Sequence, residues 1–121
     1  MADIARNELV IELAQLVDDH NGEDTLVLDI HEQSSWTDFF VISTVTSQTH
    51  MRGIIRYLNK FLQDRGISPN RGRKRVGEDG WILIDCGDFV IHLMTQENRD
   101  FYELERLWYT GKQLYHSSKS S

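Results

Sequence analysis

The sequence predicts a single α/β domain with a mixed β-sheet flanked by helices. Segments with apolar residues at helical spacing alternate with short β-branched and aromatic segments, in the order helix, two strands, helix, strands, helix. A chain of 121 residues is long enough to bury one core without disulfides or metals. The composition, 40% hydrophobic and 26% charged, is typical of a globular protein.

The first half of the chain begins with a helix and two strands. Residues 4–20 carry leucines at helical spacing, which predicts an amphipathic helix. The segments 25–30 and 39–45 are rich in β-branched and aromatic residues, so we expect each to form a strand, the second of them buried.

A second amphipathic helix follows these strands. Ser47 is a suitable N-cap, and Gly66 can end the helix. One stripe of the helix is apolar and should face the core. A second stripe, spaced at i, i+4 and i+8, should face away from the core and consists of Arg52, Arg56 and Lys60.

The second half of the chain predicts strands and a last helix. A short strand is expected around 73–76, two longer strands at 81–86 and 89–94, and a helix from Gln96 to about Tyr109. No composition change marks a linker. We therefore expect one domain over residues 1–110, and we expect residues 111–121 to be a disordered tail.

The net charge of −6 excludes a general nucleic-acid binder. Basic residues nevertheless gather between positions 52 and 75, which indicates either a solvated surface or local contact with phosphates. A single cysteine cannot form an intramolecular disulfide, which favours a reducing compartment. The N-terminus lacks the pattern of a secretory signal, and no apolar run is long enough to span a membrane. We expect a cytoplasmic protein, and the start Met favours a bacterial source.

Gly87-Asp88 predicts a two-residue hairpin turn, with glycine at the first central position as a type II′ turn requires. This turn fixes the register, so Cys86 faces Phe89 and Trp81 faces Met94. One face of the hairpin is then wholly apolar and belongs to the core. We call the other the Trp81 face; it consists of Trp81, Leu83, Asp85, Val90, His92 and Met94.

The register separates the residues that could carry chemistry. Cys86 points into the core and Asp88 lies in the turn, so neither converges with Asp85 and His92 on a metal or a nucleophilic site. We expect no catalytic residue, no metal and no cofactor. Asp85 and His92 are diagonal neighbours within reach of a hydrogen bond.

Two interpretations of the Trp81 face stay open at this point. A second layer of helix could cover it, with Asp85 and His92 satisfying each other. Alternatively, the face could be a protein-docking surface, because Trp and Met are enriched in the cores of interfaces. The last helix favours docking, since it carries a mixed stripe at i, i+3, i+4 and i+7 that is typical of an interface rim: Arg99, Tyr102, Glu103 and Arg106.

Three motifs together resemble the ribosomal silencing factor family, also called Iojap-like. They are TDFFVISTVTSQTH at 37–50, GWILIDCGDFVIHLM at 80–94 and NRDFYELERLW at 98–108, in the family's order and at suitable spacing. The resemblance implies a nucleotidyltransferase-like topology without catalytic carboxylates. It also implies a non-enzymatic protein that binds ribosomal protein L-fourteen on the large ribosomal subunit, blocks joining of the small subunit and represses translation under nutrient limitation.

The resemblance also implies which residues bind the partner. The family's docking tryptophan and tyrosine correspond to Trp81 and Tyr102. Neighbouring motif positions look like further members of the docking set: Asp85, His92, Met94, Arg99 and Arg106. A peripheral contact with ribosomal RNA is expected through Arg71, Arg73, Lys74 and Arg75. A homodimer of the free protein stays open, and no membrane partner is expected.

Two rival functions compete with this one. A nucleotidyltransferase would need carboxylates paired on one strand for Mg²⁺ and a glycine-rich phosphate loop, and the sequence has neither. An RNA-binding module that used the basic segment 52–75 would need aromatic residues interleaved with the basic ones to stack on bases, and we expect no such stacking pattern there.

Overall fold

The computed structural model describes residues 2–32, 34–35, 37–68, 73–75, 80–102 and 111–117. The side chains of 2–5, 73–75 and 100–102 lie outside this description. Along the chain the elements are α1 (Ala2–Asp19), β1 (Glu23–Asp29), β2 (Phe39–Thr44), α2 (Gln48–Asp64), β3 (Arg73–Arg75), β4 (Trp81–Asp85), β5 (Phe89–Met94), α3 (Gln96–Tyr102) and β6 (Lys112–His116). The predicted α/β domain with a mixed sheet is confirmed.

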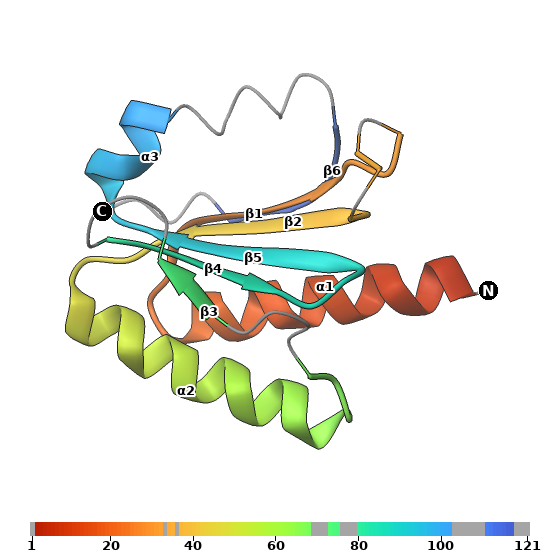
Figure 1. Cartoon of the computed structure of the whole chain (residues 1–121), viewed down its shortest axis with the longest axis horizontal. Helices are drawn as coiled ribbons and strands as arrows, with labels where there is room; N and C mark the ends of the chain where they lie inside the picture. The colour runs from red at the N-terminus through yellow and green to blue at the C-terminus, as the bar shows by residue number, and fades with distance from the viewer. Residues whose placement is uncertain are drawn as a thin grey trace.

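The sheet has six strands in the order β3-β4-β5-β2-β1-β6. β2 and β5 pair in parallel, and the other neighbouring strands pair antiparallel. α1 and α2 lie on one side of the sheet, and α3 lies on the other side (Figure 1). Among the described residues, no helix is long and apolar enough to cross a membrane.

The ends of α2 form as the sequence predicts. The Ser47 hydroxyl accepts a hydrogen bond from the His50 N–H at 3.0 Å, which satisfies one of the free donors of the first turn. At the other end Gly66 has a φ of 70°. Its N–H donates to Gln63 O and the Ile67 N–H donates to Leu62 O, the two bonds of a Schellman motif.

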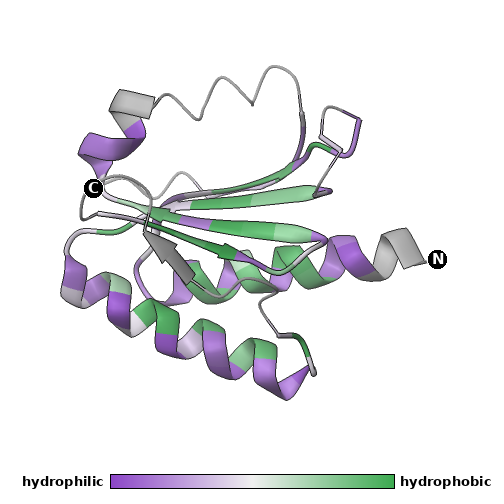
Figure 2. Ribbon diagram, in the orientation of Figure 1, coloured by the Kyte–Doolittle hydropathy of each residue, from purple (hydrophilic) through white to green (hydrophobic). Residues whose placement is uncertain are grey.

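The main core lies between the sheet and the pair α1 and α2. Buried residues of both helices pack there against inward side chains of β1, β2, β4 and β5, among them Leu13, Val27, Leu58 and Ile91. Figure 2 shows the central strands in hydrophobic colours and α2 with alternating hydrophilic and hydrophobic bands. The predicted outer stripe of α2 is confirmed, because Arg52, Arg56 and Lys60 are exposed.

The C-terminal part of the chain differs from the prediction in one segment and agrees with it in two others. The disordered tail at 111–121 is wrong for Lys112–His116, which form β6 along the outer edge of β1. The last helix is confirmed for Gln96–Tyr102, and its predicted extension to Tyr109 lies outside the described residues. The strand predicted around 73–76 is present as β3, which pairs with β4.

The covered Trp81 face as the candidate partner-binding site

The hairpin of β4 and β5 has the register that its sequence predicts. Trp81 faces Met94, Leu83 faces His92 and Asp85 faces Val90. Gly87 has a φ of 87°, a conformation that favours glycine at the first central position of the turn. The Asp88 N–H donates to Cys86 O at 3.2 Å, which is the i to i+2 bond of a γ-turn.

Asp85 stabilises this turn. Its carboxylate accepts a hydrogen bond from the Gly87 N–H at 2.9 Å, and the residue is buried. An aspartate side chain that bonds the backbone two residues onward is a turn-forming arrangement. The carboxylate therefore orders the hairpin tip, and the interaction anticipated between Asp85 and His92 is replaced by two separate ones.

His92 is paired with Trp81 instead. The Trp81 indole N–H donates to His92 Nδ1 at 3.2 Å, so Nδ1 is the acceptor and the neutral ring carries its proton on Nε2. The ring of Phe40 meets His92 edge-on, with centroids 4.6 Å apart. Burial lowers the pKa of His92 to about 4. Its Nε2 is buried and has no hydrogen-bond partner among the described residues.

The Trp81 face is covered in this structure. The exposed fraction is 8% for Trp81, 7% for Asp85, 4% for His92 and 0% for Met94. Trp81 and Met94 belong to a second apolar cluster. Its other buried members come from β1, from the residue that follows β1, and from β2: Leu26, Leu28, Ile30 and Ile42. The face is therefore covered and is not an open surface. The bond between Asp85 and His92 that the covered interpretation included is not observed, because Asp85 bonds Gly87 and His92 bonds Trp81. The docking role of these residues stays a prediction. Two apolar side chains on this side of the sheet stay only half-buried, Phe40 and Leu83.

Arg99 is also a buried residue, with 3% of its surface exposed. Its Nη1 donates to the backbone oxygen of Asp24 at 2.7 Å and to the Thr44 hydroxyl at 2.9 Å. The guanidinium thus fastens α3 to β1 and β2. Tyr102 lies in the last turn of α3 with its side chain outside the description, and Arg106 lies outside the described residues.

The basic segment has a defined place at one edge of the sheet. Arg73, Lys74 and Arg75 form β3 and pair with Ile84, Leu83 and Ile82 of β4. Arg71 lies outside the described residues. The edge strand next to the hairpin is therefore strongly basic.

Possible metal ligands and the single cysteine can be located in the described part of the chain. No group of three or more His, Cys, Asp or Glu residues there could hold a metal ion. Cys86 lies against the main core as predicted. Burial and the nearby Asp85 raise the pKa of its thiol to about 12, so it is not a thiolate nucleophile at neutral pH.

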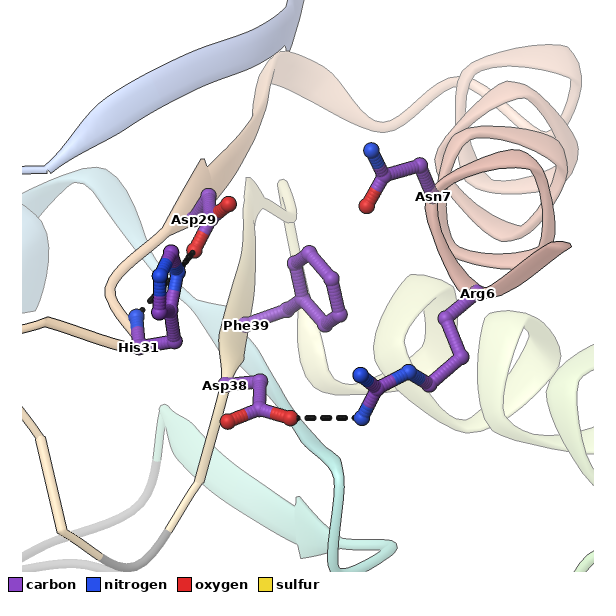
Figure 3. A pocket seen from close by; sticks show the side chains of 6 residues that line it. All are labelled: Arg6, Asn7, Asp29, His31, Asp38 and Phe39. Atoms are coloured by element: carbon purple, nitrogen blue, oxygen red, sulfur yellow. Dashed lines mark hydrogen bonds and ion pairs between the residues drawn. The ribbon is translucent and has the colours of Figure 1, made fainter. Parts of the chain in front are cut away.

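One small cavity of about 160 Å³ lies between α1 and the ends of β1 and β2 (Figure 3). Its charged groups pair with one another. Arg6 bonds Asp38 at 2.7 Å, and His31 Nδ1 lies 2.5 Å from Asp29 Oδ1, a contact that raises the pKa of His31. The pair of Arg6 and Asp38 was not predicted, because the two residues are 32 positions apart and the local sequence carries no sign of their contact.

Comparison with known proteins gives one consistent family. The family model described as "Ribosomal silencing factor during starvation" matches residues 3–120. Ribosomal silencing factors of Halalkalibacterium halodurans and Bacillus subtilis are 34% and 33% identical, over 84% and 78% of this chain and 87% and 80% of theirs. The mouse protein "Mitochondrial assembly of ribosomal large subunit protein 1" is 36% identical over 79% of this chain, which spans 43% of the mouse protein.

Solved structures agree with the fold. A crystal structure from Bacillus halodurans superposes with a TM-score of 0.63 at 34% identity, over 82% of this chain and 92% of that one. A Chromobacterium violaceum structure superposes with a TM-score of 0.75 over 94% of this chain and 92% of that one. At 24% identity the second comparison supports the fold alone.

Proposed function

We propose that this chain, which belongs to the ribosomal silencing factor family, binds ribosomal protein L-fourteen on the large ribosomal subunit and blocks association with the small subunit. Family membership gives it a ribosome-associated silencing role. The single observation that carries the proposal is the family match over residues 3–120. By blocking subunit joining, the protein would repress translation under nutrient limitation. The family's role is regulatory, and we propose no catalytic activity for this member.

The burial of the Trp81 face changes how we propose that docking works. Trp81, His92 and Met94 are too buried to be the main contact surface in this conformation. We propose that they form a rigid support, together with Asp85 and Arg99. The half-buried side chains of Leu83 and Phe40 would then contact the partner directly. Tyr102 and Arg106 would have the docking roles that the family resemblance implies.

The basic edge strand is proposed to make a peripheral contact. Arg73, Lys74 and Arg75 lie beside the hairpin that carries the docking face. Positive charge at the rim of an interface raises the association rate and contributes a salt-dependent part of the affinity. With Arg71, these residues would touch ribosomal RNA near the L-fourteen site without defining the partner.

Sedimentation of a cell lysate tests the function. We expect the protein to comigrate with free large subunits and to be absent from joined ribosomes. A pull-down with purified L-fourteen, without RNA, tests the named partner. Comigration with joined ribosomes, or no binding to large subunits, would contradict the proposal.

A pair of variants tests the surface in the same assays. Leu83→Glu should weaken binding to L-fourteen by roughly 2 kcal/mol or more, about thirtyfold, because it places a charge in the centre of the contact. Gln15→Glu adds the same charge on an exposed position of α1 and should bind like the unmodified protein. Equal binding by both variants would show that Leu83 lies outside the interface.

A further inference from the structure

The outer face of α2 carries a row of basic side chains. Arg52, Arg56 and Lys60 are exposed and follow one another at i, i+4 and i+8, so they form one stripe along the helix. The opposite stripe is buried in the main core, from Met51 to Leu62. The basic row therefore points directly away from the sheet.

Among the described residues, this row makes no ion pair that would stabilise the fold. Like charges at i and i+4 destabilise a helix, so the row acts against the element that carries it. Asp64 is the one acidic residue of α2, whereas the whole chain has a net charge of −6. α2 therefore carries a net positive charge in an acidic protein.

Arg65, just after the end of α2, differs from the basic row because its side chain makes structural contacts. Its guanidinium donates to Glu12 at 3.0 Å, which joins the end of α2 to α1. It also lies over the Phe61 ring, 3.6 Å from the ring centroid. The three arginine and lysine residues of the row make no comparable contact with the residues that the structure describes, so among these residues their charges are available to a partner.

Two neighbouring positions favour close approach of a partner to this helix. Gly53 lies beside Arg52 in mid-helix, and a Cβ added there would meet no atom within 4 Å. Such a glycine lowers helix stability and leaves the backbone bare. Tyr57 is 49% exposed, and its ring stacks on His20 with centroids 3.6 Å apart. The stacked ring of Tyr57 and the missing side chain at Gly53 thus lie next to the basic row.

We infer that the outer face of α2 binds the phosphate backbone of ribosomal RNA. The inference rests on the proposed function, because that function brings the chain to the ribosome. Evenly spaced cations suit a phosphate backbone and carry no base specificity. This contact is separate from the Trp81 face, because α2 packs on the main-core side of the sheet and the Trp81 face belongs to the second cluster on the other side (Figure 1).

The test compares two triple variants for binding to purified large subunits across a range of salt concentrations. The neutral variant is Arg52→Gln, Arg56→Gln and Lys60→Gln. The matched control, which retains every charge, is Arg52→Lys, Arg56→Lys and Lys60→Arg. All three positions are exposed, so the control should melt like the unmodified protein. The neutral variant should melt at the same or a slightly higher temperature, because it removes the repulsion between like charges at i and i+4.

We expect the neutral variant to bind about tenfold to a hundredfold more weakly at about 0.1 M salt, and its log–log salt slope to flatten by about 2 to 3. The control should keep the affinity and the slope of the unmodified protein. In a second arm, both variants should bind purified L-fourteen equally. If the neutral variant binds large subunits with unchanged affinity and slope, the inference is overturned while the proposed function stands.

Two other outcomes overturn the inference in different ways. If the neutral variant loses affinity for purified L-fourteen, the row binds an acidic protein surface and not RNA. If the unmodified protein fails to bind large subunits at all, the proposed function fails and this inference fails with it. Gly53→Gln adds a check on close approach: it should raise the melting temperature and weaken subunit binding without changing the salt slope. Binding equal to that of the unmodified protein would exclude a partner close to Gly53.

Discussion

Trp81 holds two roles at the scale of a single side chain, since its ring fills the second apolar cluster and its N–H satisfies His92. Trp81→Glu would bury a carboxylate at a site that is 8% exposed. We expect a loss of several kcal/mol in the free energy of unfolding, measured by urea denaturation followed by circular dichroism. Trp81→Phe keeps most of the packing but removes the donor, and it should cost about 1–3 kcal/mol. An unchanged urea midpoint for Trp81→Glu would show that the face is open in solution.

His92 makes folding sensitive to acid. Its pKa is lowered to about 4 in the folded protein because burial disfavours the charged ring, whereas the ordinary value is 6.5. As pH falls below 6.5 the unfolded chain takes up a proton that the folded protein rejects until pH 4. The contribution of neutral His92 to the free energy of unfolding should therefore be fully present above pH 6.5. It should fall by about 3 kcal/mol between pH 6.5 and 4.

The matched variant for this prediction is His92→Gln, which stays neutral and offers an amide oxygen to the Trp81 N–H. The other histidines are present in both proteins, so the difference between the two unfolding curves reports His92 alone. We expect the difference in unfolding free energy to change with pH in this window. A difference that stays constant from pH 7 to pH 4 would mean that His92 titrates normally.

Among the elements, β6 closes the free edge of β1 and packs on α1. Leu114 and Tyr115 lie against the main core, and the Tyr115 hydroxyl donates to the buried carboxylate of Asp18. The second oxygen of that carboxylate, Oδ1, has no hydrogen-bond partner among the described residues. Burial and Asp18 together raise the pKa of Tyr115 to about 12, so the hydroxyl keeps its proton at neutral pH.

Tyr115→Phe should therefore destabilise the protein by about 1–3 kcal/mol, because it leaves a buried carboxylate without its donor. Lys112→Ala, at an exposed position of the same strand, should change stability by no more than about 0.5 kcal/mol. Thermal unfolding of the two variants compares them directly. Equal melting temperatures would show that β6 does not hold α1 through this bond.

Local patterns were sufficient to predict some of these elements. The hairpin register follows from strict alternation of side chains and from Gly87, which accepts the positive φ that the turn needs. The boundaries of α2 follow from Ser47 and Gly66, whose bonds are local. β6 gave no such signal, because its sequence KQLYH is half polar and its partner strand lies far away in the chain.

For the whole molecule, alternation identifies the residues that share a face but not what lies over that face. The Trp81 face was therefore grouped correctly, whereas its burial could not be decided from the sequence. The bonds of Arg99 were missed for the same reason, since they reach 55 and 75 positions back to Thr44 and Asp24. The docking roles of Tyr102 and Arg106 stay predictions.

The position of β1 between β2 and β6 has a consequence for how the molecule is made. Asp18 and Tyr115 are separated by 97 positions, so the ribosome synthesises the two sides of their contact far apart in time. At about 5–20 residues per second, roughly 5 to 19 seconds pass between them. During that interval the outer edge of β1 has no strand beside it, and an unpaired edge is a template for pairing with another nascent chain. Slower elongation would lengthen this exposure in proportion.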